Sequence, residues 1–133
     1  MMSTPRQSLG RWGEALAADY LLKHGYSIID RNARTPYGEI DLVARQMEGG
    51  LVEISGEKWV TVFVEVKTRS SRSFGLPEES VNARKQAHLL AAAQAYLQQH
   101  PELEGDWRID VIAIQRYHPN QAPAIRHFEN ALH

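Results

Sequence analysis

Hydrophobic positions along the chain predict two helices packed against a sheet. Apolar residues recur at helical spacing before Gly25, a typical helix stop, so a first helix is expected from about Gln7 to His24. An alanine-rich stretch that stops before Pro101 predicts a second helix from about Val81 to Gln99. The remaining regular segments are expected to supply the sheet that these helices cover.

Alternating apolar residues and β-branched residues mark the strands. The expected strands are Tyr26 to Asp30, Glu39 to Ala44, Trp59 to Thr68, Trp107 to Gln115 and a short segment from Ile125 to Phe128. Turn residues from Thr35 to Gly38 join the first two as a hairpin, and Met47 to Lys58 is expected to be a variable loop or small hairpin. This order is typical of an α/β or α+β fold with one mixed sheet flanked by helices, and residues 1–133 are expected to form one domain.

Composition narrows the function without naming it. Lys and Arg total 15 against 16 Asp and Glu, so a surface that binds nucleic acid must be local. Without cysteine the chain has no disulfide, thiolate nucleophile or cysteine zinc site. No stretch has the length of apolar residues that a signal peptide core or a membrane span requires, which favours a cytoplasmic protein with no membrane partner.

Charged residues interrupt the two best strands at alternate positions. The period of two places Asp41 on the strand face opposite Ile40 and Leu42. In the long strand, the same period places Glu65 and Lys67 together, about 7 Å apart, on the face opposite the valines. A surface-facing ion pair at the strand end would explain these two charges without any function.

A metal site is the alternative explanation of the same charges. If the two strands pair, Asp41 and Glu65 face the same side, and two neighbouring carboxylates repel each other unless a cation neutralises them. Carboxylate oxygens suit Mg²⁺ or Mn²⁺. Lys67 would reach the same place, where an ammonium can position or deprotonate a metal-bound water and offset charge on a phosphate. A Glu-x-Lys motif alone is a weak signal, because the composition predicts roughly a third of one by chance.

The motifs also resemble those of a known family, the YraN-like uncharacterised bacterial proteins. The resemblance covers nearly the whole chain and is carried by Glu14, Gly38-Glu39-Ile40-Asp41 and Val64-Glu65-Val66-Lys67-Thr68-Arg69. That family is similar to the PD-(D/E)XK nucleases of the Holliday-junction-resolvase type, which implies a restriction-endonuclease-like core. One departure is Ile40, which stands where the superfamily's name has proline.

Site residues follow from this resemblance position by position. It implies that Asp41 and Glu65 are metal ligands, that the Val66 carbonyl is a further ligand and that Lys67 is the catalytic lysine. Glu14 would complete the metal site from the first helix, although a solvated glutamate near the helix N-terminus is an equally simple interpretation of that residue.

Basic residues flank the proposed site and could contact phosphates. They are Arg69, Arg72, Arg84 and Lys85. Ordinary solvated side chains are the alternative for all of them. The resulting hypothesis is a metal-dependent nuclease that acts on DNA or RNA, with branched DNA as the favoured substrate, and a homodimer would suit a cut in two strands. The rival hypothesis is a nucleic-acid-binding or assembly module that keeps a nuclease fold and cleaves nothing.

Overall fold

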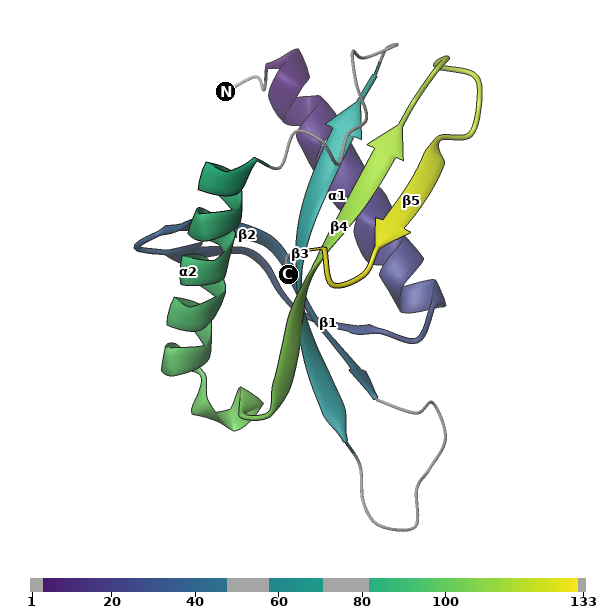
Figure 1. Cartoon of the computed structure of the whole chain (residues 1–133). Helices are drawn as coiled ribbons and strands as arrows, with labels where there is room; N and C mark the ends of the chain where they lie inside the picture. The colour runs from purple at the N-terminus through teal and green to yellow at the C-terminus, as the bar shows by residue number, and fades with distance from the viewer. Residues whose placement is uncertain (1–3, 48–57, 71–81, 132–133) are drawn as a thin grey trace.

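A computed structural model of the chain describes residues 4–47, 58–70 and 82–131 (Figure 1). Its elements, in chain order, are α1 (Pro5–Lys23), β1 (Ser27–Thr35), β2 (Gly38–Met47), β3 (Trp59–Arg69), α2 (Ala83–Gln99), a short 3-10 helix (Pro101–Leu103), β4 (Asp106–Gln115) and β5 (Ala124–Phe128). The expected loop between Met47 and Lys58 lies almost entirely outside the described residues. No helix in the described ranges combines the length and apolar character needed to cross a membrane.

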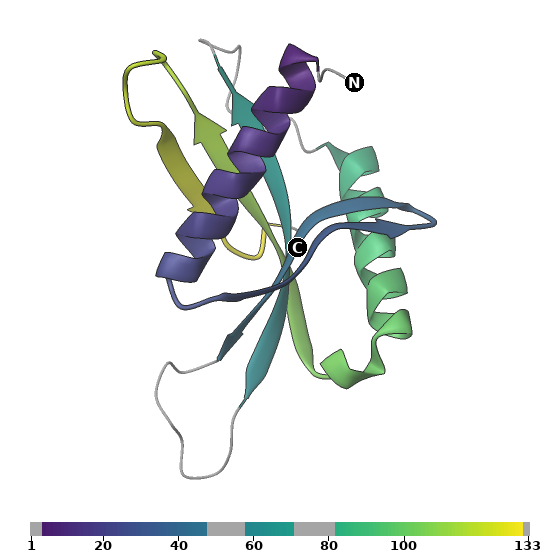
Figure 2. The ribbon, with the colours of Figure 1, turned by 180° about the vertical axis from the view of Figure 1, so that it is seen from behind.

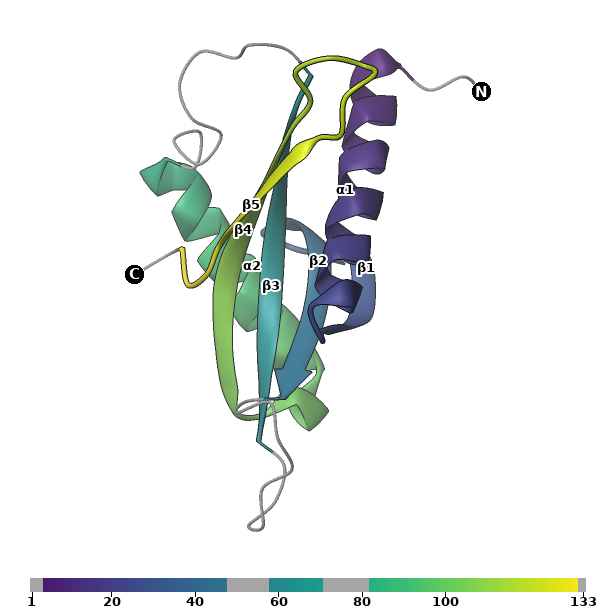
Figure 3. The same ribbon diagram turned by 90° about the vertical axis from the view of Figure 1, so that its right-hand side faces the viewer.

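The strands form one mixed sheet in the order β1-β2-β3-β4-β5. Neighbouring strands are antiparallel except for β3 and β4, which are parallel. Parallel neighbours need a crossover connection, and α2 lies in the chain between these two strands. Seen edge-on in Figure 3, the sheet lies between α1 on one side and α2 on the other. The predicted arrangement of a mixed sheet flanked by two helices is therefore confirmed.

Capping residues explain where the helices begin. The Thr4 hydroxyl accepts a hydrogen bond from the Gln7 N–H (3.1 Å), and the Gln7 side chain accepts one from the Thr4 N–H (3.0 Å). This reciprocal pair satisfies two backbone donors, so α1 begins at Pro5, slightly earlier than predicted. The Asn82 side chain accepts from the Lys85 N–H (2.9 Å) and so begins α2 at Ala83.

Two apolar clusters hold the helices to opposite faces of the sheet. On the α1 face, the fully buried Ala17 and Leu21 pack with Val62 and Val64 of β3. On the α2 face, Leu89, Ala92, Ala93 and Tyr96 pack with residues that include Phe63 of the same strand. The predicted alternation along the long strand is confirmed.

The predicted alternation along β2 is wrong at one position. Leu42 belongs to the α1 cluster as expected, but Ile40 belongs to the α2 cluster. Two residues that should share a face therefore face opposite helices, because β2 turns away from β3 between them. β1 is also longer than predicted: it runs to Thr35 and pairs along β2 as far as Gly38.

A close contact between α1 and β3 depends on Gly13. A Cβ atom at this position would stand 2.0 Å from the Thr68 Oγ1 and 3.0 Å from the Thr68 Cβ. Only glycine allows the helix to approach the strand so closely, since rotation of the threonine would leave its Cβ in place. The next residue in the helix is Glu14, so this contact brings Glu14 close to the sheet.

A buried charge network ties β5 to β4 on the α1 face. Asp110 is fully buried and accepts hydrogen bonds from Arg108 Nε (2.9 Å), His127 Nε2 (2.7 Å) and the Asn130 N–H (2.9 Å). Burial raises the pKa of Asp110, but the hydrogen bonds from His127, Arg108 and Asn130 outweigh it and hold that pKa below its usual value. The network is structural and lies apart from the acidic residues described next.

Candidate metal and active site

The strands β2 and β3 separate at Asp41. Their paired register ends at Leu42 and Val64. Beyond that pair the Val66 N–H, which faces β2, donates to Asp41 Oδ2 (2.8 Å). A carboxylate thus replaces the missing backbone partner at the point where the two strands divide. Figure 2 shows the β1-β2 hairpin leaving the sheet and extending toward α2.

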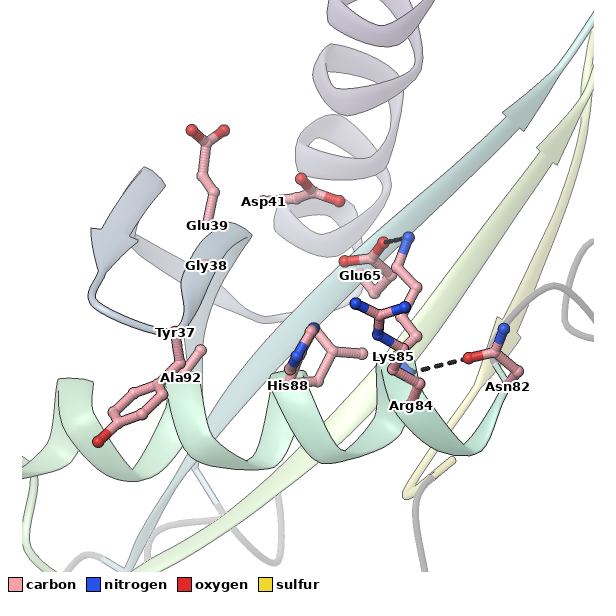
Figure 4. Close-up of a pocket in the computed structure, with 11 residues that line it drawn as sticks. Tyr37, Gly38, Glu39, Asp41, Glu65, Asn82, Arg84, Lys85, His88 and Ala92 are labelled. Carbon is pink, nitrogen blue, oxygen red and sulfur yellow. Dashed lines mark hydrogen bonds and ion pairs between the residues drawn. The ribbon is translucent and has the colours of Figure 1, made fainter.

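A cavity of about 480 Å³ lies between this hairpin and α2 (Figure 4). Tyr37, Gly38, Glu39 and Asp41 line it from the hairpin side, and Glu65 lines it from β3. From α2 and its N-cap it is lined by Asn82, Arg84, Lys85, His88, Leu89 and Ala92. Figure 4 shows the carboxylates of Asp41 and Glu65 directed toward the space between the hairpin and the helix. The cavity therefore has an acidic part and a basic part that face each other.

Glu65 is buried and contacts two lysines through one oxygen. Its Oε1 lies 3.2 Å from Lys67 Nζ and 3.1 Å from Lys85 Nζ. Lys67 comes from the same strand and its side chain is 11% exposed, whereas Lys85 comes from α2 and is 41% exposed. Two positive charges therefore compensate the buried carboxylate in this state.

Among the described residues, no cation lies within ion-pair distance of the Asp41 carboxylate, and its pKa is strongly shifted. Burial, followed by the negative charge of Glu65, raises the pKa of Asp41 from 3.8 to about 7, even though the Val66 N–H stabilises the charged form. Burial also lowers the pKa of Lys67, and the neighbouring Lys85 lowers it further. Both groups therefore titrate closer to neutrality than free side chains do, which is typical of functional sites.

Glu14, on α1, lies close enough to Asp41 and Glu65 to interact with their charges. Its charge contributes to the raised pKa of Asp41, and its own pKa is raised by burial, with the charges of Glu39 and Glu65 adding to that effect. With its side-chain nitrogen turned toward the acids, Asn32 donates to Glu14 Oε1 (3.0 Å) and Glu39 Oε1 (3.1 Å). Glu14 is therefore partly buried and hydrogen-bonded rather than freely solvated, and its role as a metal ligand stays a prediction.

The predicted basic residues differ in where the structure places them. Lys85 contacts Glu65, and Arg84 lines the cavity. Arg69 instead donates from Nη1 to the carbonyl oxygen of Thr68 (3.1 Å) and is not among the described residues that line the cavity. Arg72 lies outside the described residues, so its predicted role stays a prediction.

Sequence reasoning missed Glu39 and His88, which line the cavity, and Asn32, which contacts the acidic residues beside it. Glu39 could have been found, because it alternates with Asp41 along β2. His88 could also have been found, since it lies three residues after Lys85 on the same helix face. Asn32 carries no such signal: its role depends on a left-handed backbone conformation (φ 51°) in the middle of β1.

The donor chemistry of the site fits a hard divalent cation. Among the described residues, no three His, Cys, Asp or Glu side chains are already grouped as a metal site. Asp41 and Glu65 nevertheless supply carboxylate oxygens in a partly dry place, and the raised pKa of Asp41 means that a cation would relieve their repulsion. Such oxygen donors suit Mg²⁺ or Mn²⁺.

Comparison with known proteins gives one consistent result. The family model described as "Uncharacterised protein family UPF0102" matches residues 13–114, a range that includes the acidic residues and Lys67. A UPF0102 protein of Syntrophotalea carbinolica is 45% identical over 131 residues, which cover 98% of this chain and 96% of the relative. A UPF0102 protein of Geobacter metallireducens is 42% identical over 131 residues, covering 98% and 97%. One of Desulforamulus reducens is 40% identical over 132 residues, covering 98% and 100%.

Proposed function

The chain belongs to the uncharacterised protein family UPF0102, the YraN-like family that its motifs resemble, and we propose that it is a metal-dependent nuclease of the PD-(D/E)XK type. One observation carries the proposal. Asp41 and Glu65 come from neighbouring strands into one cavity, where burial and mutual repulsion raise the pKa of Asp41 to about 7, with Lys67 Nζ 3.2 Å from Glu65. In this proposal residues 1–133 form one restriction-endonuclease-like domain.

Asp41 and Glu65 would hold Mg²⁺ or Mn²⁺, with Glu14 and the Val66 carbonyl as further ligands. The bound ion would supply Lewis acidity and a more acidic water for attack on phosphorus. Within the protein, the Val66 N–H holds Asp41 Oδ2 in place (2.8 Å), so this ligand is oriented by the backbone of the strand that carries the other.

Lys67 would accept a proton from the attacking water and stabilise the negative charge on the reacting phosphate. Its side chain is nearly buried, and burial lowers its pKa, so the neutral amine is more accessible than in a free lysine. Nζ can then take a proton from the attacking water or, when charged, stabilise the phosphorane-like transition state. Lys85 and Arg84 lie on the opposite wall of the cavity, where a phosphate of the substrate would meet them.

DNA is the proposed substrate, and a homodimer would place two such sites on two strands. The nearly neutral composition of the chain means that the basic wall on α2, rather than a general positive charge, would guide the nucleic acid. Arg69 and Arg72 are proposed as further contacts to phosphates.

Cleavage of labelled single-stranded, duplex, flapped and branched DNA in Mg²⁺ or Mn²⁺ tests the proposal. Lys67→Ala should abolish cleavage and keep the rise in melting temperature that the metal produces, whereas Asp41→Asn should lose that rise. Lys58→Ala is a matched control, because Lys58 precedes β3 at its far end and its ion pair with Asp106 is exposed. Full cleavage by Lys67→Ala would refute the role of this lysine.

One observation favours the non-catalytic alternative. The two lysines on Glu65 Oε1 neutralise that carboxylate without any metal, as a structural ion-pair cluster would. If the protein binds DNA but cuts none of the substrates, and Mn²⁺ leaves its melting temperature unchanged, the function is that of a binding module with a retained nuclease fold.

A further inference from the structure

The aromatic end of the cavity points to the form of nucleic acid that it accepts. Tyr37 stands at the tip of the β1-β2 hairpin, lines the cavity and is 56% exposed. Figure 4 shows its ring at the hairpin end of the cavity, near the part of α2 that carries Ala92, while Lys85 and Asn82 lie at the other end. Glu65 lies at the Lys85 end, where its Oε1 is 3.1 Å from Lys85 Nζ.

The ring of Tyr37 is not needed to build the turn that carries it. The Thr35 hydroxyl accepts from the Tyr37 N–H (3.1 Å) and donates to the Gly38 carbonyl (2.7 Å), so one side chain and the backbone close the hairpin. Gly38 follows with a φ of 131°, a conformation that favours glycine. A large aromatic side chain is therefore held in solvent by a turn that would form without it.

The cavity is too small to enclose an intact duplex. From the N-cap Asn82 to Ala92 in α2, the lining extends over eleven residues, which is about 15 Å along the helix axis. That length exceeds the spacing of about 3.4 Å between stacked nucleotides of one strand, so more than one nucleotide fits along it. A volume of about 480 Å³ is that of a small-molecule site, which can hold a nucleotide but cannot enclose a duplex.

We propose that Tyr37 is a stacking platform for an unpaired nucleobase, so that the site takes a single strand or the unpaired part of a branched DNA rather than continuous duplex. This inference rests on the proposed function and names the substrate class of the same site. The lining follows the chemistry of a nucleotide: a ring at one end for the base, and cations on α2 at the other end for a phosphate. Glu65 lies 3.1 Å from Lys85 Nζ, so the carboxylates would face the phosphodiester next to the stacked nucleotide.

Binding of a short single-stranded DNA that contains 2-aminopurine tests the proposal separately from cleavage. All proteins carry Lys67→Ala, which prevents turnover, and are compared in Mn²⁺ by anisotropy and by quenching of the 2-aminopurine fluorescence. Tyr37→Ala should bind the single strand at least roughly fivefold more weakly and lose the quenching, while Tyr37→Phe keeps both. Tyr117→Ala is the matched control, because Tyr117 is 57% exposed and does not belong to the described lining of the cavity.

The outcomes separate this inference from the proposed function. If the wild type cleaves DNA and Tyr37→Ala binds and quenches like its parent, the stacking role is wrong and the nuclease stands. If nothing is cleaved but quenching depends on Tyr37, the stacking role stands and the nuclease is wrong. Equal loss of affinity for single strand and duplex, or no binding of either by the parent, would overturn the proposed preference for unpaired bases.

Discussion

Replacing Asp41 with asparagine should stabilise the metal-free protein above neutral pH. The pKa of Asp41 is raised from 3.8 to about 7, chiefly by burial and then by Glu65. Because the folded-state pKa lies above the unfolded value, the folded chain binds this proton more tightly. The resulting stabilisation is complete below about pH 4 and is lost as the pH rises through about 7.

The size of the effect follows from the same shift. Each pKa unit corresponds to about 1.4 kcal/mol, so ionising Asp41 removes up to about 4 kcal/mol of unfolding free energy by about pH 8. Asparagine is neutral at every pH and keeps an oxygen that can accept from the Val66 N–H. We therefore expect Asp41→Asn to match the wild type near pH 4 and to exceed it in stability near pH 8.

Urea unfolding in chelator at several pH values measures this difference. The control is Asp19→Asn, which removes an exposed carboxylate from α1. Addition of Mn²⁺ near pH 8 should then raise the free energy of unfolding of the wild type and leave that of Asp41→Asn unchanged. The stability difference between the two proteins should therefore shrink or change sign. A difference between wild type and Asp41→Asn that is the same at low and high pH would refute the reasoning.

Three further predictions concern other parts of the molecule. Gly13→Ala should destabilise the fold by about 1–3 kcal/mol in thermal unfolding, because the added Cβ would collide with Thr68 of β3. Gly10→Ala is the control: no atom lies within 4 Å of a Cβ there, so this substitution should stabilise α1 by up to about 1 kcal/mol. Equal effects of the two substitutions would contradict the close approach of α1 to β3. Asp110→Asn should lower the free energy of unfolding by about 3 kcal/mol near neutral pH. Because the pKa of Asp110 is lowered in the folded protein, this loss of stability, measured by urea unfolding, should become smaller as the pH falls below about 4. Lys85→Ala removes an ammonium 3.1 Å from Glu65 that competes with a cation for this carboxylate, so it should lower the Mn²⁺ concentration at half-saturation several-fold. An unchanged or higher half-saturation concentration would argue against a metal at Glu65.

Local patterns predicted most of the fold and the acidic half of the site. The existence of both helices and all five strands follows from periodicity, which neighbouring residues determine. The shared face of Glu65 and Lys67 follows from the same alternation, and the structure brings them within 3.2 Å. The family itself was also recognisable from these short motifs.

The features that sequence could not give depend on contacts between distant segments. The change of face at Ile40 arises because β2 leaves β3, and that separation has no local signature. The convergence of Lys85 on Glu65 depends on how α2 crosses the sheet, which the spacing of residues along the helix does not determine. The same holds for Asn32, whose contacts with two acids require a rare backbone angle.

The division between β2 and β3 also affects how this site would change over evolutionary time. Asp41 accepts the Val66 N–H, so a descendant that no longer performed any chemistry would still need an acceptor there to close the sheet. The ion pair of Lys67 is with the side chain of Glu65, so replacing this lysine would leave the backbone hydrogen bonds of the sheet in place. Under the proposed function, loss of the lysine across UPF0102 would therefore mark loss of chemistry, whereas an acid or amide kept at the position of Asp41 would mark only an intact fold.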